Sequence, residues 1–296
     1  MSRILVIGSV NLDVTASVSR LPVAGETVTG AALSRYPGGK GANQSLAARR
    51  LGAEVSLVAS VGSDATADEA LALLRAGGVD LSHCVAHPTA ATGTALICVA
   101  PSGENHIVVA PGANAELNRV PGALPPADAM IAQLEVPQAA IARALQGFDG
   151  LFCMNLAPAR DVDDALLERA DLVVVNETEA AWYGSRLGRC GGYVATTFGA
   201  DGAALRRGGE MIARVGSPHV DVVDTTGAGD TFTAALTVGL VEGMPPAEAL
   251  AFACAAGALA TTRPGAQPSL PGRADVEALV ADQSRWNDAG SNSATE

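Results

Sequence analysis

Short apolar runs alternate along most of the chain with stretches in which apolar residues recur every three or four positions. The apolar runs fit buried strands and lie at residues 4–7, 55–61, 130–134, 151–154, 172–175 and 193–197. The periodic stretches fit helices and lie at residues 40–51, 68–75, 137–145 and 164–168. Strands that alternate with helices are typical of a mostly parallel sheet covered by helices on both faces. The pattern therefore predicts a protein of the α/β class.

Two segments interrupt the alternation. Residues 26–34 have a strand pattern, and residues 93–109 have the pattern of a hairpin whose turn is Pro-Ser-Gly-Glu-Asn at 101–105. We expect these segments to form a small antiparallel sheet beside the main domain, with strands from about 10–36 and 88–112.

The last quarter of the chain has a different pattern. After Asp224 it is nearly all helical as far as residue 281, whereas residues 284–296 are polar and lack helix-capping residues. We predict one domain over residues 1–283 and a disordered tail over 284–296.

Acidic residues outnumber basic ones by 31 to 19, which gives the 296-residue chain a net charge of −12. The resulting field repels nucleic acid and anionic lipid, and no basic patch interrupts it. We therefore expect neither nucleic acid nor a membrane as a partner. An anionic ligand must be held by local groups such as helix N-termini, a single cation or a metal ion.

The sequence also bears on the compartment. The longest apolar run, residues 249–260, is shorter than the roughly 20 residues that span a bilayer, and no export signal is evident near the N-terminus. The five cysteines have no CxxC spacing, which argues against a disulfide framework and against a zinc site. We expect reduced thiols in a cytoplasmic protein.

The strongest local motif is VDTTGAGDTFTAAL at residues 223–236, where a strand end meets two glycines and then a helix-forming run. A helix that begins near Gly227 directs free N–H groups and the positive end of its dipole at the space above the sheet. The small residues Gly227, Ala228 and Gly229 let a phosphate approach the backbone. Asp230 has two interpretations: an acid that complements the helix dipole, or a general base that orients a hydroxyl and takes its proton.

A second glycine cluster, PGGKGANQ at residues 37–44, opens the first long helix. Its glycines permit backbone contact with a ligand, and Lys40, Asn43 and Gln44 can supply polar contacts, although a tight strand-to-helix turn explains the glycines equally well. The motif is not a Walker A loop, because Gly41 follows Lys40. The first strand also lacks GxGxxG, so a dinucleotide-binding oxidoreductase loses its main support.

Polar side chains follow several predicted strands. Asn176 and Glu179 of VNETEA could hold a hydrated Mg²⁺, or they could be the N-cap and N3 residues of an ordinary helix start. Asn11, Asp13 and Glu135 also follow strands, where open α/β sheets bind ligands. Together they suit a polyhydroxylated ligand, although each alone could be a turn residue.

Taken together, GGKGANQ (38–44) and DTTGAGD (224–230) resemble the two fingerprints of the ribokinase family, also called the phosphofructokinase-B family of sugar kinases. The likeness runs from about residue 4 to 271 and includes NETEA at 176–180 and GAQPS at 265–269. The resemblance implies a Rossmann-like three-layer α/β/α sandwich with a small antiparallel β lid. It also implies ATP-dependent transfer of the γ-phosphate to the 5-hydroxyl of D-ribose, giving ribose 5-phosphate.

The resemblance further implies roles for individual residues. Asp230 would be the catalytic base, and the amides of Gly227, Ala228 and Gly229 would form an anion hole. The implied sugar-binding residues are Asn11, Asp13, Gly39, Lys40, Asn43, Glu135 and Asp230. The implied ATP-binding residues are Asn176, Thr197, Gly199, Gly229 and Cys254. Glu179 would hold Mg²⁺ through water, and the implied ligands of an activating K⁺ are Asp224, Thr226, Ala260, Arg263, Gly265 and Ser269. ATP and a small sugar would be the partners, and the lid would pair two subunits into a homodimer.

Three features depart from the family pattern. Only residues 182–192 lie where a full helix is usual, Cys254 replaces a histidine beside the adenine, and Leu156 interrupts an NPAPA motif. These departures concern nucleotide affinity more than reaction type. Two alternatives stay open: a kinase for another sugar (deoxyribose, fructose) or a nucleoside, and a non-catalytic sugar or nucleotide sensor.

Overall fold

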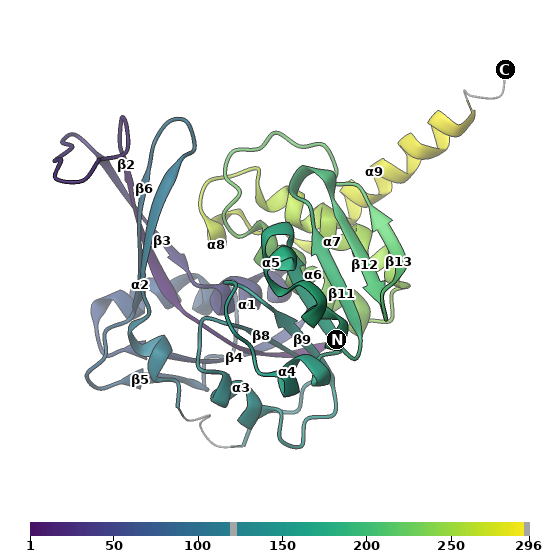
Figure 1. The fold of residues 1–296 in the computed structure, drawn as a ribbon, viewed down its shortest axis with the longest axis horizontal. Coiled ribbons are helices and arrows are strands. Elements are labelled where there is room, and N and C mark those ends of the chain that lie inside the picture. The colour runs from purple at the N-terminus through teal and green to yellow at the C-terminus, as the bar shows by residue number, and fades with distance from the viewer. Residues whose placement is uncertain (119–122, 293–296) are drawn as a thin grey trace.

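The computed structural model describes residues 1–118 and 123–292, with side chains up to residue 282. In these residues, nine strands form a central sheet in the order β13-β12-β11-β10-β9-β8-β1-β4-β5 (Figure 1). The strands are β1 (Arg3–Ile7), β4 (Glu54–Gly62), β5 (Cys84–His87), β8 (Ala129–Gln133), β9 (Leu151–Asn155), β10 (Leu172–Asn176), β11 (Tyr193–Thr197), β12 (Ala203–Arg207) and β13 (Glu210–Val215). Every pairing from β5 to β11 is parallel, and β12 and β13 extend the sheet in the antiparallel sense. The predicted mostly parallel sheet is confirmed.

Helices cover both faces of this sheet. Strand β1 shows the reason, because Ile4 and Val6 belong to one apolar core whereas Leu5 and Ile7 belong to another. The first core is completed by α1 (Lys40–Arg50), α2 (Ala65–Ala76), α6 (Ala228–Val241), α7 (Pro246–Ala260) and α9 (Arg273–Asn292). The second is completed by α3 (Gln138–Ala144), α4 (Asp164–Arg169) and α5 (Glu177–Tyr183). The predicted Rossmann-like three-layer α/β/α sandwich is confirmed.

A small second sheet projects from the main domain (Figure 1). Its order is β3-β2-β6-β7, from β2 (Asn11–Ser17), β3 (Ala32–Gly38), β6 (Gly93–Val99) and β7 (Asn105–Ala110). The predicted second sheet is confirmed, with one difference from a fully antiparallel arrangement. Strands β2 and β6 pair in parallel. Each is the first strand of an antiparallel pair, β2 with β3 and β6 with β7, and both run away from the main domain. The first return strand lies at 32–38 rather than 26–34.

Some elements were not predicted. These are the edge strands β5 and β13, which are less buried than the central strands, and β12, whose pattern ends in two arginines. At the C-terminus, α9 continues to Asn292, and residues 293–296 of the predicted disordered tail lie outside the described residues.

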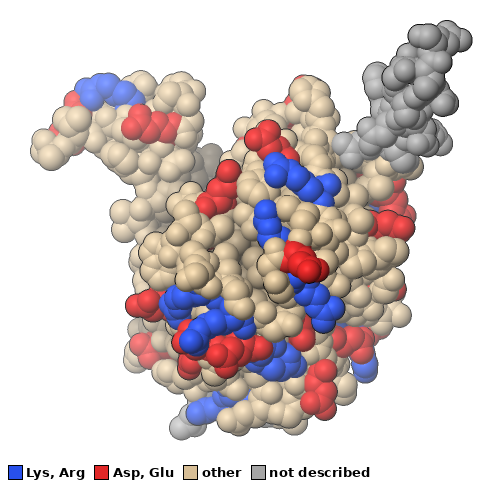
Figure 2. Space-filling view, turned by 45° about the vertical axis from the view of Figure 1, so that its right-hand side comes forward, with Lys and Arg blue, Asp and Glu red and all other residues tan. Residues whose placement is uncertain are grey.

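The described surface carries side chains of both charges. On the face shown in Figure 2, basic and acidic side chains are intermixed, and the small sheet stands apart from the body across an open hollow. Within the described residues, no helix is both long enough and apolar enough to cross a membrane.

Candidate active site

The N-terminus of α6 leaves several backbone amides without an acceptor. Gly227 caps the helix in the left-handed conformation (φ 82°), which residues with a Cβ rarely adopt. The Ala228 amide donates to the Thr225 carbonyl at 3.2 Å. The amides of Gly227, Gly229 and Asp230 have no acceptor among the described residues. Two of the three predicted anion-hole amides, those of Gly227 and Gly229, are therefore available to a ligand, together with that of Asp230.

Asp230 occupies the first turn of α6 and is 7% exposed. Its carboxylate accepts two hydrogen bonds from α1: Asn43 Nδ2 donates to Oδ2 at 2.8 Å, and Gln44 Nε2 donates to Oδ1 at 3.0 Å. The two fingerprints that lie almost 190 residues apart therefore meet at this carboxylate. The Asn43 Oδ1 atom is buried without a partner in the described structure, so the protein leaves one acceptor of this side chain unused.

The predicted sugar-binding residues gather beside Asp230. They form one wall of the site, which we call the acidic wall. Gly39 lies at its start with a φ of 89°, and a Cβ at this position would lie only 2.7 Å from the Asn11 backbone nitrogen. Glu135 accepts bonds from the Ser9 hydroxyl and, at 3.2 Å, from the Lys40 amide. The Asn11 side chain is fixed by Asn114, whose Nδ2 donates to Asn11 Oδ1 at 2.7 Å.

This wall is strongly acidic. Burial, followed by the charges of Glu135 and Asp230, raises the pKa of Asp13 from 3.8 to about 7, against the opposing effect of Lys40. Burial lowers the pKa of Lys40, but Asp230, Glu135, Glu179 and Asp13 together outweigh it and hold the pKa above its usual range. Lys40 therefore remains a cation in the site.

A cavity of about 210 Å³ extends from Asp230 toward the strand ends. It is lined by Lys40, Asn155, Ala157, Val174, Val175, Asn176, Glu179, Thr197, Thr225, Gly227, Gly229 and Asp230. The predicted base, two amides of the anion hole and three predicted nucleotide-side residues (Asn176, Glu179 and Thr197) therefore face one space.

Two residues at the start of α5 cap this helix and also line the cavity. Asn176 Oδ1 accepts from the Glu179 amide and Glu179 Oε2 accepts from the Asn176 amide, each at 2.8 Å, which is a complete capping box. Burial raises the pKa of Glu179, although the Asn176 amide and Lys40 oppose it. The helix-start interpretation is correct, and Glu179 still lines the cavity.

The loops predicted to hold K⁺ meet at Asp224. Its Oδ1 accepts from the Thr226 amide (2.9 Å) and hydroxyl (2.6 Å), and its Oδ2 accepts from the Gly265 amide at 2.8 Å. Burial acts to raise the pKa of Asp224, but these bonds hold it below its usual range. The carbonyl of Thr261 joins the same loops by accepting from the amides of Val223 and Asp224.

The remaining three predicted K⁺ residues lie nearby in sequence but form no hydrogen bond with Asp224 in the described structure. Ala260 is buried at the end of α7, Arg263 is exposed, and Ser269 is buried and donates to the Ala266 carbonyl. Ser269 belongs to the short helix α8 (Ala266–Ser269). Both polar atoms of the Gln267 side chain in the same helix are buried without a partner among the described residues.

Two predicted nucleotide residues do not line the cavity. Gly199 begins the 3₁₀ helix η3 (Gly199–Asp201), and Cys254 is buried in the apolar core of α7. Burial raises the pKa of the Cys254 thiol to about 12, which leaves it unreactive.

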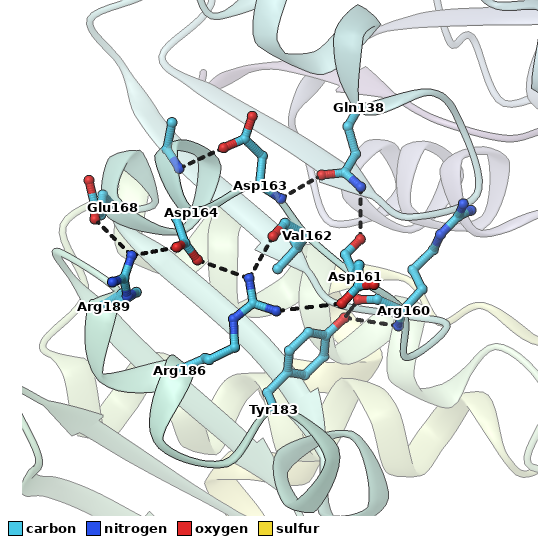
Figure 3. Close-up of polar contacts among 11 residues, drawn as sticks. Gln138, Arg160, Asp161, Val162, Asp163, Asp164, Glu168, Tyr183, Arg186 and Arg189 are labelled. Carbon is cyan, nitrogen blue, oxygen red and sulfur yellow. Dashed lines mark hydrogen bonds and ion pairs between the residues drawn. The ribbon is translucent and has the colours of Figure 1, made fainter.

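The short segment after α5 is compact. The 3₁₀ helix η2 (Gly184–Arg189) is joined to the start of α4 by ion pairs, in which Arg186 and Arg189 both contact Asp164, at 2.9 and 2.5 Å (Figure 3). The Tyr183 hydroxyl donates to the Arg160 carbonyl at 2.8 Å. These contacts tie the segment to residues 160–164.

Sequence reasoning assigned no role to four polar residues around the site: Ser9, Asn114, Gln133 and Asn155. Ser9 and Asn155 follow or end strands, so the strand-end rule that found Asn11 and Glu135 could have included them. Gln133 ends β8 in the same way. Asn114 lies in the 3₁₀ helix η1 (Gly112–Glu116) and has no local signal of this kind.

The chain is similar to known proteins in sequence and in fold. The pfkB family of carbohydrate kinases matches residues 1–273. The ribokinase of Bacillus subtilis is 35% identical over 295 residues, which cover 95% of this chain and 100% of that protein. The ribokinase structure from Thermotoga maritima superposes with a TM-score of 0.86 at 30% identity, covering 95% of this chain and 100% of the other. Arabidopsis thaliana ribokinase, solved with ribose and ATP, gives 0.83 at 30% identity, with 94% and 98% covered. The chain therefore belongs to the pfkB family of carbohydrate kinases.

Proposed function

We propose that this protein transfers the γ-phosphate of ATP to the 5-hydroxyl of D-ribose. The observation that carries the proposal is the position of Asp230, on the first turn of α6 beside free amides and hydrogen-bonded to Asn43 of the sugar side. The relatives named as ribokinases and the related structure that holds ribose and ATP support the same substrates.

The chemistry follows from this arrangement. The Asp230 carboxylate takes the proton of the 5-hydroxyl as its oxygen attacks the γ-phosphorus, and the bond from that phosphorus to the β-phosphate oxygen breaks. ADP leaves with the electron pair of that bond, and the sugar becomes ribose 5-phosphate. The amides of Gly227 and Gly229 stabilise the negative charge on the transferred group, and Lys40 adds a positive charge nearby.

We propose that Mg²⁺ enters with ATP and is held through water by Glu179. The fit rests on donor chemistry, since Glu179 is a carboxylate facing the cavity and Mg²⁺ prefers oxygen ligands and retains several waters. Among the described residues, no cluster of three or more His, Cys, Asp or Glu side chains could hold a metal by itself. Bound Mg²⁺ would neutralise phosphate charge.

We also propose a K⁺ site at the joined loops of Asp224 and Gly265. The predicted donors are oxygen atoms of a carboxylate, a hydroxyl and backbone carbonyls, which suit K⁺. The orphaned Gln267 amide beside Gly265 fits loops that order further around a cation. K⁺ would fix the loop that precedes the anion hole.

The small sheet is proposed to pair two subunits. It exposes Leu33, Leu96, Ile107, Val108 and Val109, an apolar surface that a monomer would leave in water. The five cysteines are free, which supports a reducing compartment such as the cytoplasm.

A coupled assay over ribose, deoxyribose, fructose and nucleosides tests the substrate. We expect the highest kcat/KM with ribose, and a higher value with any other acceptor would overturn the narrow assignment while keeping the kinase. Turnover with none of them would instead support a non-catalytic sensor.

The role of Asp230 is tested against a matched surface acid. Asp68 lies in the first turn of α2 with an exposed side chain, so Asp68→Asn removes a favourable interaction with a helix dipole and an exposed ion pair with Arg75 (3.2 Å), both far from the cavity lining. We expect Asp230→Asn to lower kcat by about 10²- to 10⁴-fold, with ATP binding retained, whereas Asp68→Asn leaves kcat unchanged. Equal behaviour of the two variants would reduce Asp230 to a dipole-complementing residue.

A further inference from the structure

Gln44 lies between the proposed base and a second layer of amides. Its side chain is 0% exposed and is not among the groups that line the cavity. Gln44 Nε2 donates to Asp230 Oδ1 at 3.0 Å and to Asn155 Oδ1 at 3.1 Å, and Gln44 Oε1 accepts from Gln133 Nε2. All the polar atoms of this side chain are therefore used inside the protein.

The partners fix the direction in which the Gln44 amide points. Asn155 Nδ2 donates to the Val174 carbonyl at 3.2 Å, so Asn155 must turn its oxygen toward Gln44. Gln133 presents its amide nitrogen to the Gln44 oxygen. A reversed Gln44 amide would bring its oxygen against the oxygens of Asp230 and Asn155. Gln133 adds no constraint, because its own oxygen has no partner among the described residues. The network thus permits one orientation, in which Gln44 donates to the carboxylate.

We propose that Gln44 is a positioning residue that sets the plane of the Asp230 carboxylate. Asn43 holds Oδ2 and Gln44 holds Oδ1, so the carboxylate cannot rotate without breaking one of these bonds. This inference rests on the proposed role of Asp230 as the base. Proton transfer requires a hydrogen-bond distance to the reacting hydroxyl, and a displacement of about 1 Å can cost about 100-fold in rate.

The two neighbouring residues on α1 differ in what they leave for a ligand. Asn43 keeps an unpartnered buried oxygen, whereas Gln44 has no polar atom to spare. Loss of Gln44 should therefore alter turnover without altering substrate affinity.

The test uses Gln44→Met, which keeps the volume and removes the donor, and Gln44→Glu, which keeps the shape and replaces the donor with an acceptor. We expect kcat to fall about 10- to 100-fold in both, with the KM values for ribose and ATP within about threefold of wild type. Ser45→Ala is the matched control, because it removes a buried hydrogen bond to the Gly41 carbonyl from the next position of α1. Ser45→Ala should keep the wild-type kcat.

A double-mutant cycle separates positioning from general damage. In the Asp230→Asn background, Gln44→Met should cause no further loss of kcat, because its effect passes through the carboxylate. An equal loss in both backgrounds, or a rise in KM with unchanged kcat, would overturn the inference. If Gln44→Met does not fold, the same double-mutant cycle is run with Gln44→Glu and with Gln133→Met, which removes the donor to the Gln44 oxygen. Each should lower kcat in the wild-type background and cause no further loss in the Asp230→Asn background.

The outcome also separates this inference from the proposed function. If Asp230→Asn retains normal turnover, the proposed role of Asp230 as the base is wrong. If Asp230→Asn is impaired and the Gln44 variants are not, only the positioning role is wrong.

Discussion

Replacement of Asp13 by asparagine tests the electrostatics of the acidic wall. Asp13 faces Glu135 and Asp230, and burial together with these charges raises its pKa from 3.8 to about 7. Asparagine has nearly the same shape and carries no charge. We expect Asp13→Asn to weaken ribose binding and, unusually for a change in a binding pocket, to stabilise the fold at neutral pH.

The sign follows from proton binding. Between about pH 4 and pH 7 the folded protein keeps a proton on Asp13 that the unfolded chain has released, so stability falls as pH rises. The contribution of Asp13 is complete below about pH 4 and is lost as pH rises through about 7. At about 1.36 kcal/mol for each pKa unit, the full loss is at most about 4 kcal/mol, and partial contact with water reduces our expectation to about 2 kcal/mol.

Urea unfolding without ligands measures this effect at about pH 5 and about pH 8. The stability of Asp13→Asn relative to wild type should rise by about 1 to 2 kcal/mol between these conditions. Asp68→Asn corrects for the general benefit of removing one negative charge from an acidic protein. Parallel stability profiles for Asp13→Asn and wild type would refute the reasoning, as would a destabilised variant at pH 8.

Two further predictions concern the backbone and the wall of the site. Gly227→Ala should destabilise the protein by about 1 to 2 kcal/mol in urea unfolding, because φ is 82° and the new Cβ would lie 3.1 Å from Ala266. Gly229→Ala should leave the free energy of unfolding unchanged or slightly higher, since its Cβ meets open space. The same variant should lower kcat, because the new methyl group crowds the proposed anion hole. A stability loss equal to that of Gly227→Ala would contradict this prediction. Tyr183→Phe should lower the free energy of unfolding by about 1 kcal/mol by removing the bonds to Arg160, with kcat unchanged in the coupled assay.

The sequence predicted the central strands because they are buried on both faces and therefore read as continuous apolar runs. It did not predict β13, whose side chains are mostly exposed at the edge of the sheet. The two fingerprints were visible because glycines and a helix start have local signatures. The bond between Gln44 and Asp230 joins residues 186 positions apart, and no local pattern indicates such a pairing.

Local donors explain how a protein with a net charge of −12 would bind a nucleotide beside clustered acids. Four acidic side chains, those of Asp13, Glu135, Glu179 and Asp230, raise the pKa of Lys40 and keep it protonated, and α6 supplies amides whose positive dipole does not depend on pH. An amide cradle would stabilise phosphate charge without neutralising the proposed base, whereas several lysines or arginines in its place would pair with Asp230 and hold its oxygens away from the sugar. The proposed division of labour therefore needs uncharged donors: backbone amides would serve the phosphate, and Asn43 and Gln44 donate to the Asp230 carboxylate.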